Sequence, residues 1–138
     1  MSASAQRHEV DALLTFRAVG SAAPIANDTV TSSSLTFDLL SSYWDNGEQS
    51  GKHQFAVFGY IDAVVAGGGT LTIETSVTGA FGDTVTHVTA VKTAVGAFNY
   101  VLSREQIGLA TAIRIVSTPV TASDAAGFHA FMAPVTGG

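Results

Sequence analysis

The stretch VVAGGGTLTIETSVTG, residues 64–79, decides the fold class. Leu71, Ile73 and Val77 alternate with polar side chains, mostly threonines, so the apolar residues fall on one face at a period of two. That period is typical of a β-strand with one buried face, and β-branched threonine suits its pleated surface. The triple glycine at 67–69 predicts a turn before the strand, and a further glycine marks its end.

The same alternation recurs in short segments separated by turn-forming residues, and no long segment has helical periodicity. One helical turn after Ser103 is compatible with the sequence, because serine is a favoured N-cap residue. We therefore predict an all-β fold: one jelly-roll or β-sandwich domain of about eight antiparallel strands over residues 10–138, preceded by a flexible N-terminal arm at residues 1–9. The alternation predicts these core residues: Leu14, Phe16, Leu35, Phe37, Phe55, Val57, Ile61, Leu71, Ile73, Val77, Ile113, Ile115, Phe128 and Met132.

The composition predicts a surface that is covered in part by other protein. Charged residues make up 12% of the 138 residues and hydrophobic residues 46%, whereas ordinary soluble domains are about 25% charged. In FAVFGYIDAVV, residues 55–65, both strand faces are apolar, with Phe58 and Tyr60 on the face opposite the predicted core. We expect a homodimer or homotrimer whose contact is formed by Phe58 and Tyr60, with Phe131 behind them.

Several partner classes are disfavoured. The net charge of −5 and the lack of a Lys/Arg cluster argue against nucleic acid as a partner. No basic amphipathic helix and no apolar run of bilayer length is present, so we expect no membrane association. The N-terminus lacks the apolar segment of a secretory signal, which predicts synthesis in a cytoplasm without export by that route. Without cysteine, disulfides and thiolate chemistry are absent.

The sequence contains no recognisable catalytic or metal-binding motif. The triple glycine is not followed by Lys-Ser/Thr and leads into a strand, so it is no phosphate loop, and no GxSxG elbow is present. Four histidines have none of the usual metal-ligand spacings: His8, His53, His87 and His129. Two carboxylate pairs have the residue types of a glycosidase site, but nothing in the sequence brings either together: Asp45 with Glu48, and Asp62 with Glu74. We expect no catalytic residue, no metal and no cofactor.

Two further candidate contact sites lie in polar segments. Tyr43 and Trp44 begin the most polar part of the chain, and exposed aromatic side chains anchor protein interfaces or stack on sugars. A structural pair that closes one end of the sandwich is the alternative. Arg7 and His8 lie in the predicted arm, which suits contact with a neighbouring protein chain.

Four segments follow one another in an order that is familiar from one group of proteins: GSAAPIANDTVTSSSLTFDLL (20–40), FAVFGYIDAVVAGGGTLTIETSVTG (55–79), AIRIVST (112–118) and AGFHAFMAPV (126–135). This order resembles the jelly-roll capsid cement, or decoration, proteins of tailed phages, of the type known from a Bordetella podovirus. The resemblance implies a structural virion protein on the capsid exterior. Its partner would be the major capsid protein of an assembled HK97-like shell, whose neighbouring subunits it would lock together. A carbohydrate-binding or host-adhesion module and a small enzyme with a site built from separate strands are the alternatives.

Overall fold

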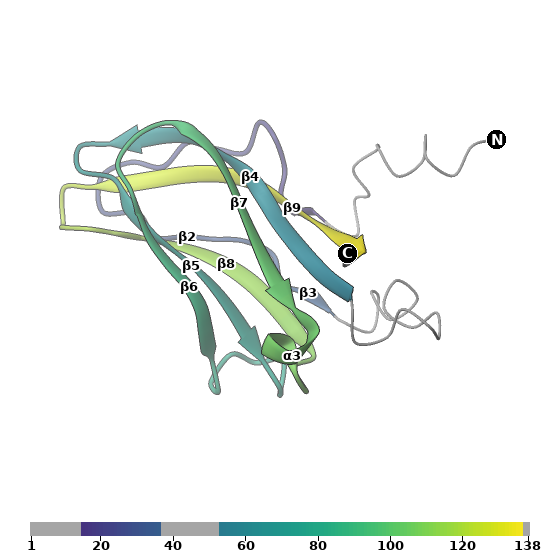
Figure 1. Cartoon of the computed structure of the whole chain (residues 1–138). Coiled ribbons are helices and arrows are strands. Elements are labelled where there is room, and N and C mark those ends of the chain that lie inside the picture. The colour runs from purple at the N-terminus through teal and green to yellow at the C-terminus, as the bar shows by residue number, and fades with distance from the viewer. Residues whose placement is uncertain (1–14, 37–52, 137–138) are drawn as a thin grey trace.

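The computed structural model describes residues 15–36 and 53–136. These residues form nine strands and one short helix, arranged as two antiparallel sheets that face each other (Figure 1). The elements are β1 (Thr15–Arg17), β2 (Val30–Thr31), β3 (Leu35–Thr36), β4 (His53–Val65), β5 (Gly69–Ser76), β6 (Val85–Lys92), β7 (Gly96–Ser103), α3 (Arg104–Ile107), β8 (Ala112–Pro119) and β9 (Ala125–Thr136).

Sheet A has the strand order β1-β9-β4-β7, and sheet B has the order β2-β8-β5-β6, with β3 also paired to β8. Val30 of β2 lies opposite Ser117, and Leu35 of β3 lies opposite Ile113, so both short strands follow the same edge of β8. Counted as one interrupted strand, β2 and β3 reduce the nine strands to eight. The resulting order, in which each sheet mixes strands from both halves of the chain, is that of a jelly roll. The predicted all-β fold class is confirmed, while the predicted arm at residues 1–9 lies outside the described residues.

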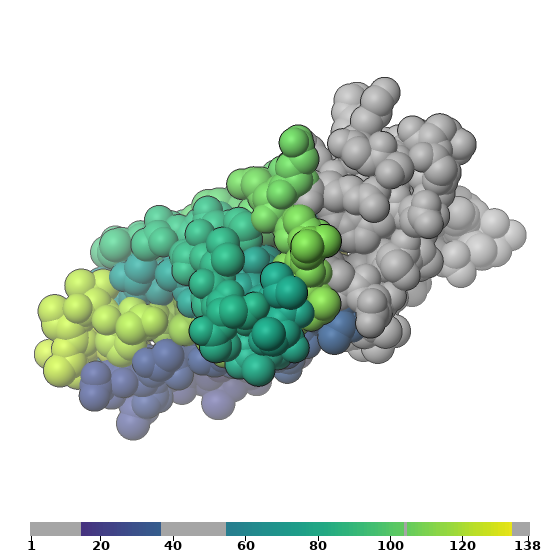
Figure 2. Space-filling model, turned by 90° about the horizontal axis from the view of Figure 1, so that it is seen from below, coloured from purple at the N-terminus to yellow at the C-terminus, as the bar shows by residue number. Residues whose placement is uncertain are grey.

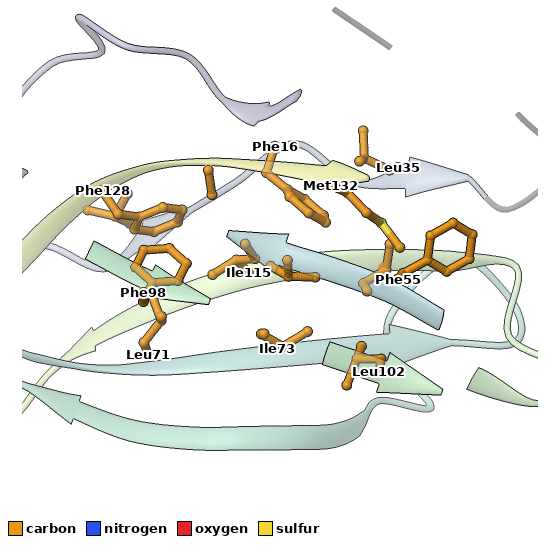
Figure 3. Close-up of a cluster of buried hydrophobic side chains, with 14 of the residues drawn as sticks. Phe16, Leu35, Phe55, Leu71, Ile73, Phe98, Leu102, Ile115, Phe128 and Met132 are labelled. Carbon is orange, nitrogen blue, oxygen red and sulfur yellow. The ribbon is translucent and has the colours of Figure 1, made fainter. Parts of the chain in front are cut away.

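The core lies between the two sheets (Figure 3). Its members alternate along the strands of each sheet, and fully burying one large apolar side chain contributes about 1.5–3 kcal/mol. Of the predicted core residues that the structure describes, all but Val77 are buried: Phe16, Leu35, Phe55, Val57, Ile61, Leu71, Ile73, Ile113, Ile115, Phe128 and Met132. Leu14 and Phe37 lie outside the described residues.

The prediction for Val77 is wrong. Its side chain is 52% exposed, because β5 ends at Ser76 and the chain turns into a loop. In that loop the backbone N–H of Val77 donates to the carboxylate of Asp83, at 2.9 Å. The alternation of β5 therefore stops one residue before Val77, and Thr75 and Ser76 are the buried residues at this end of the strand.

The helical turn after Ser103 is confirmed as α3, and it adds a core residue that alternation did not predict. The Ser103 hydroxyl accepts from the backbone N–H of Gln106 at 3.1 Å, while the Gln106 side chain accepts from the backbone N–H of Ser103 at 2.8 Å. This reciprocal pair is a capping box. It fixes α3 so that Ile107 packs into the core, where Phe98 and Leu102 of β7 are also buried.

The glycine turn that was predicted from the sequence carries the chain from sheet A to sheet B. The Val65 carbonyl accepts from the backbone N–H of Gly68 at 3.0 Å. Gly68 has a φ of +83°, and a Cβ there would overlap the carbonyl oxygen of Lys92. Glycine is therefore required at this position, and the tight turn allows β5 to start directly over the opposite sheet.

Candidate functional site

The outer face of sheet A carries four neighbouring rings, here called the aromatic patch: Phe58, Tyr60, His129 and Phe131. In the antiparallel pairing of β4 with β9, Phe58 lies opposite Phe131. Tyr60 lies opposite His129, two residues further along each strand. Since strand side chains alternate between faces, the patch points away from the core, to which Val57 of β4 and Phe128 and Met132 of β9 contribute.

The rings of the patch are in contact with one another. The ring centroids of Phe58 and Phe131 are 5.8 Å apart at an interplanar angle of 44°. Tyr60 stacks on His129 with 6.0 Å between centroids and an angle of 22°. A tilted contact of 5.9 Å joins His129 to Phe131. Aromatic pairs at such separations each contribute about 0.5–1.5 kcal/mol beyond their buried area, so the patch holds its shape before any partner binds.

The patch is open to solvent and continues onto β7. Tyr60 is 40% exposed, and the other three rings are half-buried. On β7, Asn99 lies opposite Phe58 and Ala97 lies opposite Tyr60, and both β7 residues are exposed. Val101, on the same face of β7, is 48% exposed. Apart from Asn99 and the imidazole of His129, this surface is apolar across three neighbouring strands, which is typical of a contact site for another molecule.

A carboxylate orients the imidazole within the patch. The Oδ2 atom of Asp62 lies 3.0 Å from Nδ1 of His129, and both side chains are partly buried. Because an ionised carboxylate only accepts hydrogen bonds, Nδ1–H of His129 is the donor. Asp62 reaches this position from an irregularity in β4, where the pairing with β9 shifts register between Ile61 and Ala63. The pair fixes the ring against which Tyr60 stacks.

Among the described residues, no contact joins another histidine to His129. The Nε2 atom of His87 lies 2.8 Å from the hydroxyl of buried Thr75, and burial lowers the pKa of His87. His53 is the first residue of β4, and His8 lies outside the described residues. Within the described part of the chain, no three His, Asp or Glu side chains are grouped so that they could hold a metal ion.

Asp62 and Glu74, one of the two carboxylate pairs considered from the sequence, are not brought together. Glu74 lies on β5 in sheet B and forms an ion pair with Arg114 of β8 at 2.9 Å. The guanidinium of Arg114 also lies 4.3 Å from the ring centroid of Phe81. Asp62 belongs to sheet A and has His129 as its partner. Both carboxylates thus have local partners, and the other pair, Asp45 and Glu48, lies outside the described residues.

A third carboxylate organises the loop between β5 and β6. Asp83 accepts hydrogen bonds from the hydroxyls of Ser76 at 2.6 Å and Thr78 at 2.9 Å. It also accepts from the backbone N–H groups of Val77 and Thr78. These bonds, led by that from Ser76, hold the pKa of Asp83 well below its usual value. These donors are Ser76 at the end of β5 and residues of the loop that follows, so Asp83 ties the loop to the strand.

A fourth carboxylate joins three turns at the opposite end of the sandwich. Asp124 accepts from the backbone N–H of Gly67 at 2.8 Å, and from the N–H and hydroxyl of Thr121 at 2.8 and 2.7 Å. These bonds, with that from Gly67 the largest cause, lower the pKa of Asp124. The backbone N–H of Asn27 donates to the Asp124 carbonyl at 2.8 Å. Figure 2 shows the N-terminal loop, in blue, against the β8–β9 turn in yellow-green.

The structure brings together three of the contact residues that the sequence predicted, namely Phe58, Tyr60 and Phe131. The other predicted contact residues lie outside the described residues: Arg7, His8, Tyr43 and Trp44. Sequence reasoning missed His129 and Asp62 as parts of this surface. The alternation in residues 126–133 places His129 on the same strand face as Phe131, which is the signal that was available.

The chain matches no family model, no curated protein and no solved structure. Among the described residues, no helix has the length and apolar character needed to cross a membrane.

Proposed function

We propose that this chain is a structural virion protein, a capsid cement protein that binds the outer surface of an assembled phage shell through the aromatic patch. The single observation that carries the proposal is the patch itself, a pre-organised cluster of rings on the outside of a jelly-roll sheet. The order of segments in the sequence, which resembles that of phage cement proteins, supplies the class of partner. The major capsid protein is that partner.

The chemistry of the patch suits protein contact. Tyrosine is enriched at binding hot spots, where a large ring is buried in a pocket of the partner. Tyr60 offers its exposed ring together with a hydroxyl, and the stack on His129 limits the freedom that Tyr60 would lose on binding. The half-buried rings of Phe58 and Phe131 provide an apolar surround that would exclude water from the contact.

In this proposal, the contact exists only on the assembled shell, where two or more capsid subunits meet. Weak contacts then add through multivalency, because an oligomer of the cement protein engages several subunits at once. Arg7 and His8 of the predicted arm, and the aromatic pair Tyr43 and Trp44, are further candidate contacts from the sequence. Each of them would extend the contact beyond the patch.

The test is co-sedimentation of purified protein with expanded shells that lack it, alongside free major capsid protein. We expect binding to expanded shells and none to free subunits. Tyr60→Asp should weaken shell binding at least tenfold, because it places a charge in the contact. Val85→Asp is the matched control, since Val85 is 53% exposed on β6 of the other sheet. Absence of wild-type binding to the shells would refute the proposal. Equal losses of shell binding for both variants would show that the aromatic patch is not the contact site.

Glycan binding is a second candidate, favoured by the exposed ring of Tyr60 two residues from the carboxylate of Asp62. Aromatic rings stack on sugars, and carboxylates accept hydrogen bonds from their hydroxyls. A glycan array probed with the wild-type protein and with Tyr60→Ala tests it. Binding that is lost in the variant would support this function, and an array without signal would exclude the glycans presented.

A further inference from the structure

In the described part of the chain, strand β7 is an edge of sheet A. It ends the strand order of that sheet and pairs with β4 from Gln54–Ser103 to Ile61–Gly96 without a register shift. Among the described residues, no strand pairs with its other side. An edge strand directs alternate backbone N–H and C=O groups away from its sheet, where they are free to pair with another extended chain.

The β7 edge lacks the features with which proteins block such pairing. Its sequence, GAFNYVLS, has no charged residue and no proline. The other edges differ: β1 has three residues including Arg17, and β2 and β3 have two residues each. The eight-residue edge strand β6 carries Lys92, and its pairing with β5 is interrupted by a register shift. Charges, irregular pairing and short length all protect an edge, so among the described strands β7 is the edge that lacks such protection in its own sequence.

We propose that two copies of this chain pair through β7, antiparallel and about a two-fold axis at Asn99, so that two copies of sheet A form one continuous sheet. The inference goes beyond the proposed function and does not depend on it. It moves the expected self-association contact from Phe58 and Tyr60 to the neighbouring strand. The patch is then left free for a different partner.

The sequence of β7 is compatible with pairing to itself. In a two-fold antiparallel pair, residues that face each other must lie on the same side of the sheet. With Asn99 opposite itself, Ala97 of one copy lies opposite Val101 of the other, a small side chain against a larger one. The two Asn99 amides offer donors and acceptors to each other. β7 has no charged residue of its own, so none of its side chains brings a like charge to the axis. The ammonium of Lys92 from β6 lies 5.2 Å from the ring centroid of Tyr100, on the side of β7 opposite to Asn99.

The symmetry has a consequence for the outer face. A two-fold axis perpendicular to a sheet leaves its outer side on the outside in both copies. The aromatic patch adjoins β7 through the pairing of Phe58 with Asn99 and of Tyr60 with Ala97. Two patches would therefore lie on one side of the joined sheet, and a dimer could engage two neighbouring sites on a repeating surface.

Sedimentation equilibrium at micromolar concentration tests the pairing with a matched pair of variants. Val101→Lys places a charge on the β7 edge at a residue that is 48% exposed. Val91→Lys makes the same change on the β6 edge, at 59% exposure. We expect a dimer for the wild type and for Val91→Lys, and a monomer for Val101→Lys. A monomeric wild type, or a dimer that survives Val101→Lys, would overturn the proposal.

Cross-linking tests the register independently, because the chain has no cysteine of its own. Asn99→Cys places two thiols opposite each other at the axis, within disulfide reach, and mild oxidation should give a covalent dimer. Ala97→Cys is the control, because its two copies lie four residues out of register and should stay uncoupled. Equal cross-linking of both variants, or of neither, would contradict this register. The readouts need no shell, so a failed shell-binding test would leave this result standing.

Discussion

Two valines that alternation treats alike should respond differently to the same truncation. Val57 of β4 is fully buried in the core, whereas Val77 is 52% exposed beyond the end of β5. Both were expected inside from the sequence. Replacing each by alanine removes the same atoms, so the difference between the two variants measures burial and little else.

The expected losses of stability follow from the burial of each side chain. Val57→Ala removes about two methylene equivalents from the core at about 0.8 kcal/mol each, and the cavity raises the loss to about 2–3 kcal/mol. At Val77 half of the side chain is already in water, and surface substitutions usually stay within about 0.5 kcal/mol. The backbone N–H of Val77 still donates to Asp83 in the variant, because the main chain is unchanged.

Urea unfolding followed by far-UV circular dichroism measures both losses. With a slope of about 1–3 kcal/mol per molar urea, Val57→Ala should lower the midpoint by roughly 1 M. Val77→Ala should move it by a small fraction of that amount. Similar shifts for the two variants would refute the placement of Val77 outside the core, and an unchanged midpoint for Val57→Ala would refute the placement of Val57 within it.

Three further predictions use the same unfolding assay. Hydrogen bonds hold the pKa of Asp83 and of Asp124 below its usual value, so the stability they add is complete above about pH 4 and is lost as the pH falls below it. The urea midpoint of the wild type should therefore fall as the pH is lowered below about 4. Asp83→Asn or Asp124→Asn should make the midpoint less dependent on pH. The same dependence on pH in both variants and the wild type would contradict this prediction. Gly68→Ala should be destabilising, because φ is +83° and a Cβ would overlap the carbonyl oxygen of Lys92. Gly82→Ala is the control and should be neutral, because its Cβ would meet no atom. Equal losses of stability would contradict the requirement for glycine in the turn at Gly68. Ser103→Ala removes the cap of α3 and should cost about 1 kcal/mol, and wild-type stability would show that the cap is dispensable.

Alternation within a strand predicted the faces of the molecule well. It placed Phe58 and Tyr60 opposite the core face of their strand, and the structure has both on the outer side of sheet A. It failed at Val77 because alternation does not report where a strand ends. Strand β5 ends where the loop around Asp83 begins. The hydrogen bonds of this loop form only when the chain turns back and brings Asp83 next to Val77.

The partners across strands could not be predicted from the sequence. His129 stacks on Tyr60 because β4 and β9 pair in one particular register, and the two residues are far apart in the chain. A shift of that register by one residue would turn one strand over and separate the rings. Asp62 reaches His129 through an irregularity in the pairing of β4, which no local sequence pattern predicts. The buried Ile107 depends likewise on a capping box that positions one short helix.

The position of the patch in sheet A bears on how well it can serve as a contact surface. Its residues lie on β4 and β9, the two central strands of the sheet, and each of these strands is paired on both sides. Such strands are held by two ladders of hydrogen bonds, so the rings sit on a backbone that has little freedom left to lose. The conformational cost of binding falls mainly on the side chains, and ring contacts within the patch already restrict these. Within the part of the chain that the structure describes, the edge strand β7 beside them is paired on one side only. In the described residues, sheet A thus combines a rigid aromatic face with an adjacent edge strand, and the two proposals assign a different partner to each.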